Sequence, residues 1–239
     1  PNNGVKMNEE ERLVVVTGAG RGVGAATVKA LLRIPGTRVI AVSRTLNDLV
    51  ASLDDPSRLE CCPLDLSATD AATRLMAHIG GRRLHALVNN AGLLHKAEIG
   101  THQRIALEKV FLTNAIAPLE LSQALAPALA GEPPGHIVHI GSMGGFQDSV
   151  KFPGLVAYSA SKAALACMAQ CLAEEFKDKG VRSNCLALGS VNTAMLRAAF
   201  PDFEAATTVE EMGQFVAEFS LRGHNLFNGK VIPVASSTP

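Results

Sequence analysis

Tyr158 and Lys162 are the two residues of this chain whose types and spacing most directly indicate chemistry. On a helix, side chains four residues apart share a face, with Cα atoms about 6 Å apart along the axis. A free phenol has a pKa of about 10, which is too high for ready proton exchange at neutral pH. A nearby cation lowers that pKa. The pair therefore predicts a proton donor and the cation that tunes it, although such a pair alone is also typical of a solvated helix face.

Composition and charge restrict the class of protein. The 239 residues suit one large domain, and 47% are apolar against 18% charged, which is typical of a globular chain. Basic and acidic residues number 22 each, so the formal net charge is zero, which argues against a nucleic-acid partner held by phosphate neutralisation. No apolar run approaches the roughly 20 residues that a membrane span needs, and the polar N-terminus does not resemble a signal peptide. We expect neither a nucleic-acid nor a membrane partner.

The cysteines and histidines show no metal-binding pattern. The five cysteines are odd in number and lack a zinc spacing. Cys167 and Cys171 stand four residues apart on a predicted helix, and we interpret them as small buried thiols. The seven histidines, His95 and His102 among them, match no metal-ligand motif, so we predict no metal site. A reducing cytoplasm is the simplest location for such a chain.

Strand-like and helix-like stretches alternate from one end of the chain to the other. Leu13–Thr17 is a short apolar run, typical of a parallel strand covered on both faces. Further strands are predicted at 38–43, 59–64, 84–88, 136–140, 181–188 and 230–234, and helices at 22–33, 46–53, 68–79, 102–129, 157–177 and 209–219. Pro118 and Pro127 are expected to kink or break the helix at 102–129.

Repeated βα units joined by short loops predict a doubly wound α/β architecture. We expect one Rossmann-type catalytic domain over residues 13–239, with a mostly or fully parallel seven-stranded sheet and helices on both faces. The polar segment 1–12 is predicted to be a flexible tail, and residues 189–208 to form the substrate loop.

The first βα junction carries a glycine-rich turn that suits a dinucleotide. Glycines permit the tight turn and let the backbone approach a pyrophosphate, which the N-terminus of the next helix attracts. The absence of a Gly-Lys-Ser/Thr ending excludes a nucleoside-triphosphate loop. A merely flexible turn is the plainer alternative, which the strand-turn-helix setting disfavours. The predicted cofactor-binding residues here are Gly18, Gly20, Arg21, Gly22, Val23 and Gly24.

The second strand ends in Ser43-Arg44, where the choice between NAD and NADP is usually made. A free ribose 2′-hydroxyl calls for an acid near this point, whereas a 2′-phosphate calls for an arginine. Arg44, with Arg21 as a second cation, therefore favours NADP(H) over NAD(H), although either could be an ordinary surface residue. Asp65, followed by Leu66, could bind the adenine amine or only cap the next helix.

With these motifs in place, the chain resembles the short-chain dehydrogenase/reductase family over residues 12–235. The shared features are Thr17-Gly18-x-x-x-Gly22-x-Gly24, Asn89-Asn90-Ala91-Gly92, Asn114, Ser142 and Tyr158-x-x-x-Lys162, in the family's order and spacing.

The resemblance implies a role for each matching side chain. Tyr158 would donate a proton to the substrate oxygen as hydride leaves the nicotinamide, and Ser142 would hold that oxygen. Lys162 would bind the nicotinamide ribose and lower the pKa of Tyr158, and Asn114 would fix a water that connects Lys162 to solvent. Placed donors of this kind stabilise the negative charge that develops on a carbonyl gaining hydride. Near the cofactor the resemblance also places Asn90, Ala91, Gly92, Gly189, Val191 and Thr193.

Some segments depart from the family pattern. Leu188 stands where the family usually has proline before Gly189. The short stretch 194–228 lacks a Pro-Leu-Gly-Arg element, and the last strand runs into Val234-Ala235-Ser236-Ser237 rather than Asp-Gly-Gly. Both departures argue against a carrier-protein substrate and against the usual tetramer contact. Apolar residues in the loops after the strands suggest an apolar cleft or ordinary packing: Met143, Phe146, Phe152, Met195 and Phe200.

The sequence thus predicts an NADPH-dependent enzyme that reduces a ketone, aldehyde or 3-oxoacyl group to an alcohol. A pterin-type reductase is the nearest alternative, because such enzymes also have a short tail. A catalytically silent NADP-binding sensor or scaffold is an alternative of a different class. The family likeness predicts a homodimer or homotetramer, with the helices near 106–125 and 157–177 as candidate contacts.

Overall fold

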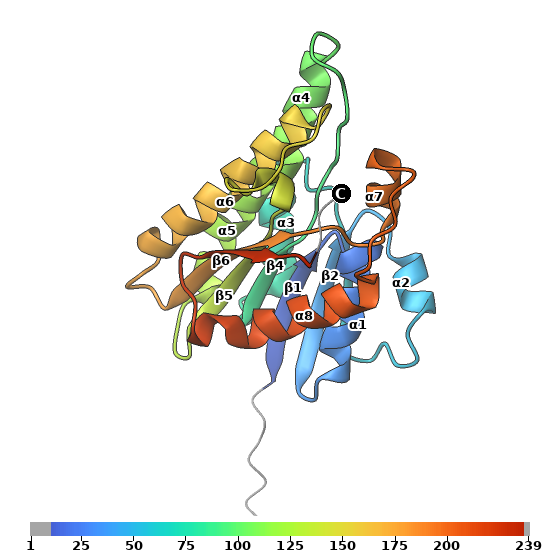
Figure 1. The fold of residues 1–239 in the computed structure, drawn as a ribbon. Coiled ribbons are helices and arrows are strands. Elements are labelled where there is room, and N and C mark those ends of the chain that lie inside the picture. The colour runs from blue at the N-terminus through green and yellow to red at the C-terminus, as the bar shows by residue number, and fades with distance from the viewer. Residues whose placement is uncertain (1–10, 237–239) are drawn as a thin grey trace, which may run out of the picture.

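The computed structural model describes residues 11–236, which form one α/β domain around a seven-stranded parallel sheet (Figure 1). The strand order is β3-β2-β1-β4-β5-β6-β7, so the chain runs outward to one edge and then returns past β1 to build the other half. This reversal between β1 and β4 is the point at which doubly wound sheets bind ligands. The strands are β1 (Arg12–Thr17), β2 (Thr37–Ser43), β3 (Leu59–Pro63), β4 (Ala86–Asn89), β5 (Gly135–Ile140), β6 (Val181–Leu188) and β7 (Val231–Val234).

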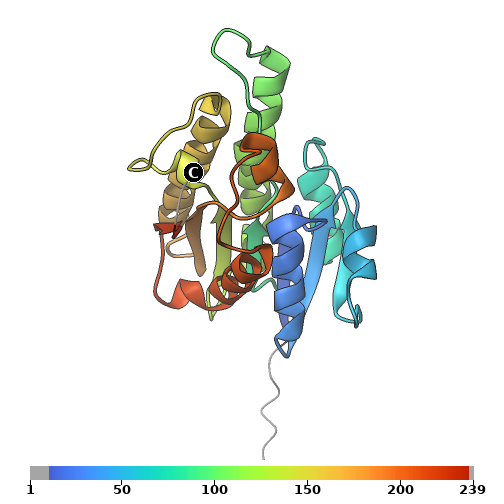
Figure 2. The ribbon, with the colours of Figure 1, turned by 45° about the vertical axis from the view of Figure 1, so that its right-hand side comes forward.

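Helices cover both faces of the sheet, as Figures 1 and 2 show. The α-helices are α1 (Gly22–Arg33), α2 (Asn47–Ala51), α3 (Ala71–Ile79), α4 (Arg104–Phe111), α5 (Ala117–Leu129), α6 (Val156–Glu175), α7 (Ala194–Ala199) and α8 (Val209–Arg222). Three short helices, η1 (Leu112–Ile116), η2 (Met143–Gly145) and η3 (Gly223–Asn225), join them.

Two hydrophobic cores explain why the strands read as continuous apolar runs. Val14 and Val16 of β1 face one core, which α1 and α8 cover, while Val15 between them faces the other. Helices α3, α5 and α6 supply Leu75, Leu125 and Leu172 to that second core. Because successive residues of a strand point to opposite faces, a strand buried on both sides must be apolar throughout.

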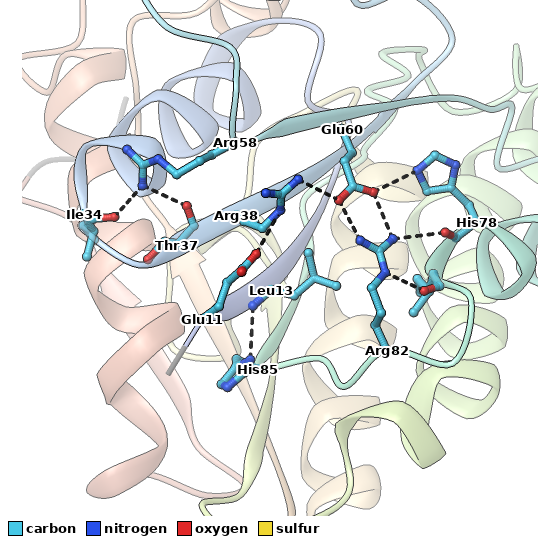
Figure 3. Close-up of polar contacts among 11 residues, drawn as sticks. Glu11, Leu13, Ile34, Thr37, Arg38, Arg58, Glu60, His78, Arg82 and His85 are labelled. Atoms are coloured by element: carbon cyan, nitrogen blue, oxygen red, sulfur yellow. Dashed lines mark hydrogen bonds and ion pairs between the residues drawn. The ribbon is translucent and has the colours of Figure 1, made fainter. Parts of the chain in front are cut away.

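The edge strand β3 is tied to its neighbours by charge, as Figure 3 shows. The Glu60 carboxylate accepts two hydrogen bonds from Arg82, at 2.6 and 2.9 Å. Arg38 of β2 and His78 of α3 each approach the same carboxylate to 3.6 Å. The hydrogen bonds from Arg82 hold the pKa of Glu60 below its usual value.

The predicted order of elements is confirmed, but some boundaries and one interpretation are wrong. The segment predicted as one helix at 102–129 consists of α4, the π-helix η1 and α5, which follow one another without a break, and Pro118 is the second residue of α5, directly after the π-helix. Pro127 lies within α5, two residues before its end. Helix α7 was not expected. Cys167 and Cys171 are exposed on α6 rather than buried.

The last two residues of the predicted flexible tail, 1–12, are part of the ordered domain. Arg12 is the first residue of β1, and Glu11 forms a 3.0 Å ion pair with Arg38. Residues 1–10 lie outside the described part of the chain. Within residues 11–236, no helix is both long and apolar enough to cross a membrane, and no cluster of three or more side chains suited to a metal ion occurs.

Candidate active site

The glycine turn after β1 is packed so closely that side chains would not fit. Gly18 and Gly22 have positive φ angles, 64° and 56°, which favour glycine. A Cβ at Gly18 would lie 2.8 Å from Ala91 Cα, and one at Gly20 would lie 2.9 Å from Ser43 Oγ. At Gly22, by contrast, a Cβ would meet only the Thr193 methyl group, at 3.8 Å. The turn is therefore seated on the ends of β2 and β4, and it has room for a further group at Gly22.

Asn90 and Thr17 lock this turn to the end of β4. The Asn90 side-chain amide donates to the carbonyl oxygens of Thr17 and Gly18, at 2.9 and 3.2 Å. The Thr17 hydroxyl accepts from the backbone N–H groups of Asn90 and Ala91, at 3.0 and 3.1 Å. Gly24 is needed here as well, since a Cβ would collide with the Gly18 carbonyl and the Asn90 amide. Val23 is the second residue of α1, the helix that follows.

Arg21 and Arg44 lie on two segments that Gly20 brings together. Both arginines are exposed, and neither forms an ion pair shorter than 4.0 Å within residues 11–236. Arg44 lies near enough to Asp65 to help lower the pKa of that carboxyl, although hydrogen bonds from Ser67 are the main cause. Asp65 accepts from the backbone N–H and the hydroxyl of Ser67 in the turn after β3 and does not cap α3, whose N-cap residue is Asp70; Leu66 beside it is partly buried.

Ser142 and Tyr158 are brought together by the seating of η2 on α6. A Cβ at Gly145 would lie 2.6 Å from the backbone of Lys162 and Ala163, so only glycine allows this approach. Ser142 caps η2 by accepting from the Gly144 N–H at 3.1 Å, and its hydroxyl also hydrogen-bonds Tyr158. The two groups that would contact a substrate oxygen therefore already share a hydrogen bond.

Lys162 is buried, with 4% of its surface exposed. Its ammonium donates to the carbonyl oxygen of Ile140, the last residue of β5, at 2.7 Å. Burial lowers the pKa of Lys162 to about 8, while the charge interaction with nearby Cys185 acts to raise it. A Cβ at Gly92 would lie 3.3 Å from the ammonium, so the loop after β4 also converges on this charge.

The predicted effect of Lys162 on Tyr158 is not what the structure shows. Burial raises the pKa of Tyr158, and the hydrogen bond with Ser142 is the interaction that lowers it. The ammonium is engaged at Ile140, and desolvation of the phenol outweighs the attraction that spacing alone suggested.

Asn114 connects α6 to the loop after β4 from within the π-helix η1. Its side-chain oxygen accepts from the Leu93 N–H at 2.7 Å, and its amide donates to the Leu93 carbonyl and to Ser161 Oγ, both at 2.9 Å. Ser161 in turn donates to the Tyr158 carbonyl at 2.7 Å. Both amide protons of the Asn114 side chain are already used in these hydrogen bonds, so a water bound at this residue would need a different group of it as partner. Short π-helical segments such as η1 are frequent at functional sites.

The loop after β6 folds back over the glycine turn. The Gly189 N–H donates to Val234 of β7 at 2.8 Å, so Leu188 simply extends the strand where the family usually has proline. Val191 pairs with Thr207 through an isolated bridge, and Thr193 caps α7 by accepting from the Leu196 N–H at 3.1 Å. The Thr193 methyl group lies nearest to the space at Gly22, so this loop borders the glycine turn.

The predicted apolar residues are only partly brought together. Phe152 and Phe200 meet edge to face, with ring centroids 5.2 Å apart. Met143 and Phe146 are partly buried around η2, and Met195 is 37% exposed. Of these five residues, Phe152 and Phe200 thus form a ring contact, and the Phe146 N–H donates to the Met143 carbonyl at 3.1 Å within η2 and its cap.

Comparisons with known proteins agree with this geometry. Residues 12–203 match the family model described as short chain dehydrogenase. Carbonyl reductase (NADPH) 2 of Sus scrofa is 33% identical over 208 residues, covering 87% of this chain and 83% of that protein. A rhamnolipid-biosynthesis 3-oxoacyl-carrier-protein reductase of Pseudomonas aeruginosa is 30% identical, covering 93% and 94%.

A solved structure shows the same fold with a cofactor. A putative NAD(P)-dependent gluconate 5-dehydrogenase from Beutenbergia cavernae with bound NADP superposes with a TM-score of 0.83, is 30% identical, and covers 94% of this chain and 95% of that one. The fold and the site define an NAD(P)-dependent oxidoreductase that acts on CH–OH and C=O groups. The chain belongs to the short-chain dehydrogenase family.

Two residues of the site were not predicted as members of it. Thr17 was noted only as the start of the glycine motif, and its hydroxyl holds the backbone after β4. Ser161 joins Asn114 to the Tyr158 carbonyl. A serine within a helix often donates to the carbonyl oxygen three or four residues before it, so the sequence could have predicted the bond from Ser161 to the Tyr158 carbonyl. The contact of Ser161 with Asn114 depends on tertiary packing and has no such local signal.

Proposed function

We propose that this protein is an NADPH-dependent reductase that converts a ketone, aldehyde or 3-oxoacyl group to an alcohol. The observation that carries the proposal is the convergence of Ser142, from the loop after β5, with Tyr158 and Lys162 of α6, next to the loop after β4 on which the glycine turn is seated. The bound nicotinamide would supply the hydride. Tyr158 would supply the proton to the substrate oxygen, and Ser142 would hold that oxygen by a hydrogen bond.

The pKa directions support the reductive half of this chemistry. Burial keeps Tyr158 protonated at neutral pH, as a proton donor must be before the reaction. Lys162 would bind the ribose hydroxyls and stabilise the phenolate that forms once the proton has left. Asn114 would then position a water through which Lys162 recovers a proton from solvent. Burial of the site strengthens each of these charge interactions.

The proposed preference for NADPH rests on Arg21 and Arg44. Both side chains are exposed and lie on segments that meet at Gly20. A guanidinium matches the two oxygens of a phosphate through its planar donors. The name of the Sus scrofa relative, an NADPH carbonyl reductase, supports the same choice. The cytoplasmic location and the homodimer or homotetramer remain predictions.

A panel of carbonyl compounds, assayed by NADPH oxidation, tests the proposal. We expect turnover by the wild type on at least one class and a loss of about 100-fold or more in Tyr158→Phe, since a placed acid contributes about that much. Cofactor affinity should be unchanged in the variant. If neither protein turns over any carbonyl although both bind NADPH tightly, the protein is a cofactor-binding sensor instead.

A further inference from the structure

Three loops that are far apart in the sequence meet at Lys96. The loop after β4 contributes Lys96, the loop after β5 contributes Phe152 and Gly154, and the loop after β6 contributes α7 and Phe200. Ala97 donates a backbone hydrogen bond to Gly154 at 2.9 Å, which joins the first two loops. Figures 1 and 2 show α7, in orange, near the edge of the sheet that the C-terminal ends of the strands form.

Lys96 binds the end of α7 rather than an acidic side chain. Its ammonium donates to the carbonyl oxygen of Ala199, the last residue of that helix, at 2.6 Å. The same ammonium lies 5.4 Å from the centre of the Phe200 ring. Within residues 11–236 it forms no ion pair shorter than 4.0 Å. A cation at a helix C-terminus satisfies an unpaired carbonyl and interacts favourably with the helix dipole.

The loop after β5 leaves room for this contact. A Cβ at Gly154 would lie 3.1 Å from Lys96 Cγ, and the glycine has a φ of +81° that other residues rarely adopt. Phe152 packs edge to face on the ring of Phe200, the same ring that the Lys96 ammonium approaches. Phe200 therefore contacts both Lys96 and Phe152.

Helix α7 has few other attachments to the domain. Ala199 is its one buried residue, and the hydroxyl of Thr193 caps its start. Six residues are too few for a helix that is stable by itself. Its position must therefore depend on the cap at one end and on the contacts of Lys96 and Phe152 at the other.

We propose that Lys96 is a specificity-determining residue, which fixes residues 194–200 of the predicted substrate loop against the loops after β4 and β5 and so limits the size of carbonyl compound that reaches Tyr158. The effect on size selectivity rests on the proposed function. The effect on loop position does not, because it follows from the contacts of Lys96 alone. Lys96 acts through the loop and does not contact the reacting atoms.

Tryptic cleavage after Arg197 measures the loop directly, without turnover. Arg197 is exposed and lies within α7. In Lys96→Met, which keeps the aliphatic stem and removes the charge, cleavage at this bond should be roughly tenfold faster, the factor expected for the loss of one charge-assisted hydrogen bond that is partly exposed. Lys96→Arg should restore slow cleavage, since a guanidinium can bind the same carbonyl and ring.

The matched control is Lys177→Met, which removes an exposed lysine far from α7. It should be cleaved after Arg197 at the wild-type rate. Phe152→Ala, which removes the second contact of Phe200, should accelerate cleavage as Lys96→Met does. If Lys96→Met and wild type are cleaved equally fast, Lys96 does not hold the loop and the proposal is wrong.

Kinetics test the consequence for specificity. In Lys96→Met we expect kcat/KM for bulky carbonyls to rise at least threefold relative to small ones, mainly through KM, with the Kd for NADPH unchanged. Faster cleavage with an unaltered ratio in an active enzyme would overturn the specificity role. If the wild type reduces no carbonyl at all, the proposed function fails, and the proteolysis still decides whether Lys96 fixes the loop.

Discussion

Replacing the buried Lys162 by methionine should stabilise the protein while it abolishes activity. Burial lowers the pKa of Lys162 from 10.5 to about 8, so at pH 7 the folded chain carries a charge in an unfavourable environment. At about 1.4 kcal/mol for each pKa unit, this cost is about 3 kcal/mol. Methionine has a similar length and no charge, so it removes the cost.

The net gain is smaller because one hydrogen bond is also lost. The ammonium donates to the Ile140 carbonyl at 2.7 Å, and a bond of this kind contributes about 1 kcal/mol. Lys162→Met should therefore raise the free energy of unfolding at pH 7 by about 2 kcal/mol. For a chain of this size the melting temperature should rise by roughly 4–8 °C. Without Lys162, NADPH-dependent turnover should be lost.

Thermal unfolding followed by circular dichroism, from pH 7 to pH 10.5 and without added cofactor, measures this effect. Between pH 8 and 10.5 the unfolded chain binds a proton at Lys162 that the folded chain has already released, so the wild type gains stability with rising pH. The advantage of the variant should shrink across this window and disappear near its upper end. Lys177→Met, an exposed lysine, should show no such change. A variant that is less stable at pH 7, or a difference that does not depend on pH, would refute the reasoning.

Three further predictions concern the cofactor, the sheet edge and the assembly. Arg44→Asp should weaken NADPH by about 10- to 100-fold and NADH far less, as measured by cofactor fluorescence; equal losses would show that Arg44 does not bind the 2′-phosphate. Glu60→Gln should lower the free energy of unfolding at pH 7 by about 1 kcal/mol, because the hydrogen-bonded carboxylate of Glu60 has a lowered pKa. In urea unfolding, the difference between variant and wild type should shrink as the pH drops below 4.5, and a difference that persists at pH 3 would contradict this. Leu119→Glu, at a residue 40% exposed on α5, should lower the mass measured by light scattering if α5 forms the predicted contact, and an unchanged oligomer would exclude that contact.

Much of the fold could be predicted because its signals are local. Apolar strands alternate with helices, and Leu13–Thr17 reads as buried on both sides because both of its faces do pack on helices. Helix α7 could not be found in this way, since its position depends on contacts from loops about 50 and 100 residues away. The exposure of Cys167 and Cys171 was missed because a thiol suits either environment.

The site shows a similar division between what is local and what is not. The spacing of Tyr158 and Lys162 identified the pair, since both belong to one helix. The direction of the Tyr158 pKa depends on burial and on where the ammonium is engaged, and neither is encoded in spacing. The π-helix η1 around Asn114 was not predicted either. The side-chain amide of Asn114 is fixed by Leu93 and Ser161, which belong to other parts of the fold.

Transfer of deuterium from C4-deuterated NADPH to a carbonyl substrate, read by mass spectrometry of the alcohol, tests the central claim most directly. For the wild type we predict one deuterium on the carbinol carbon. Tyr158→Phe, with an unchanged Kd for NADPH, should transfer it about 100-fold more slowly or not at all. Transfer by Tyr158→Phe at the wild-type rate would show that Tyr158 does not supply the proton.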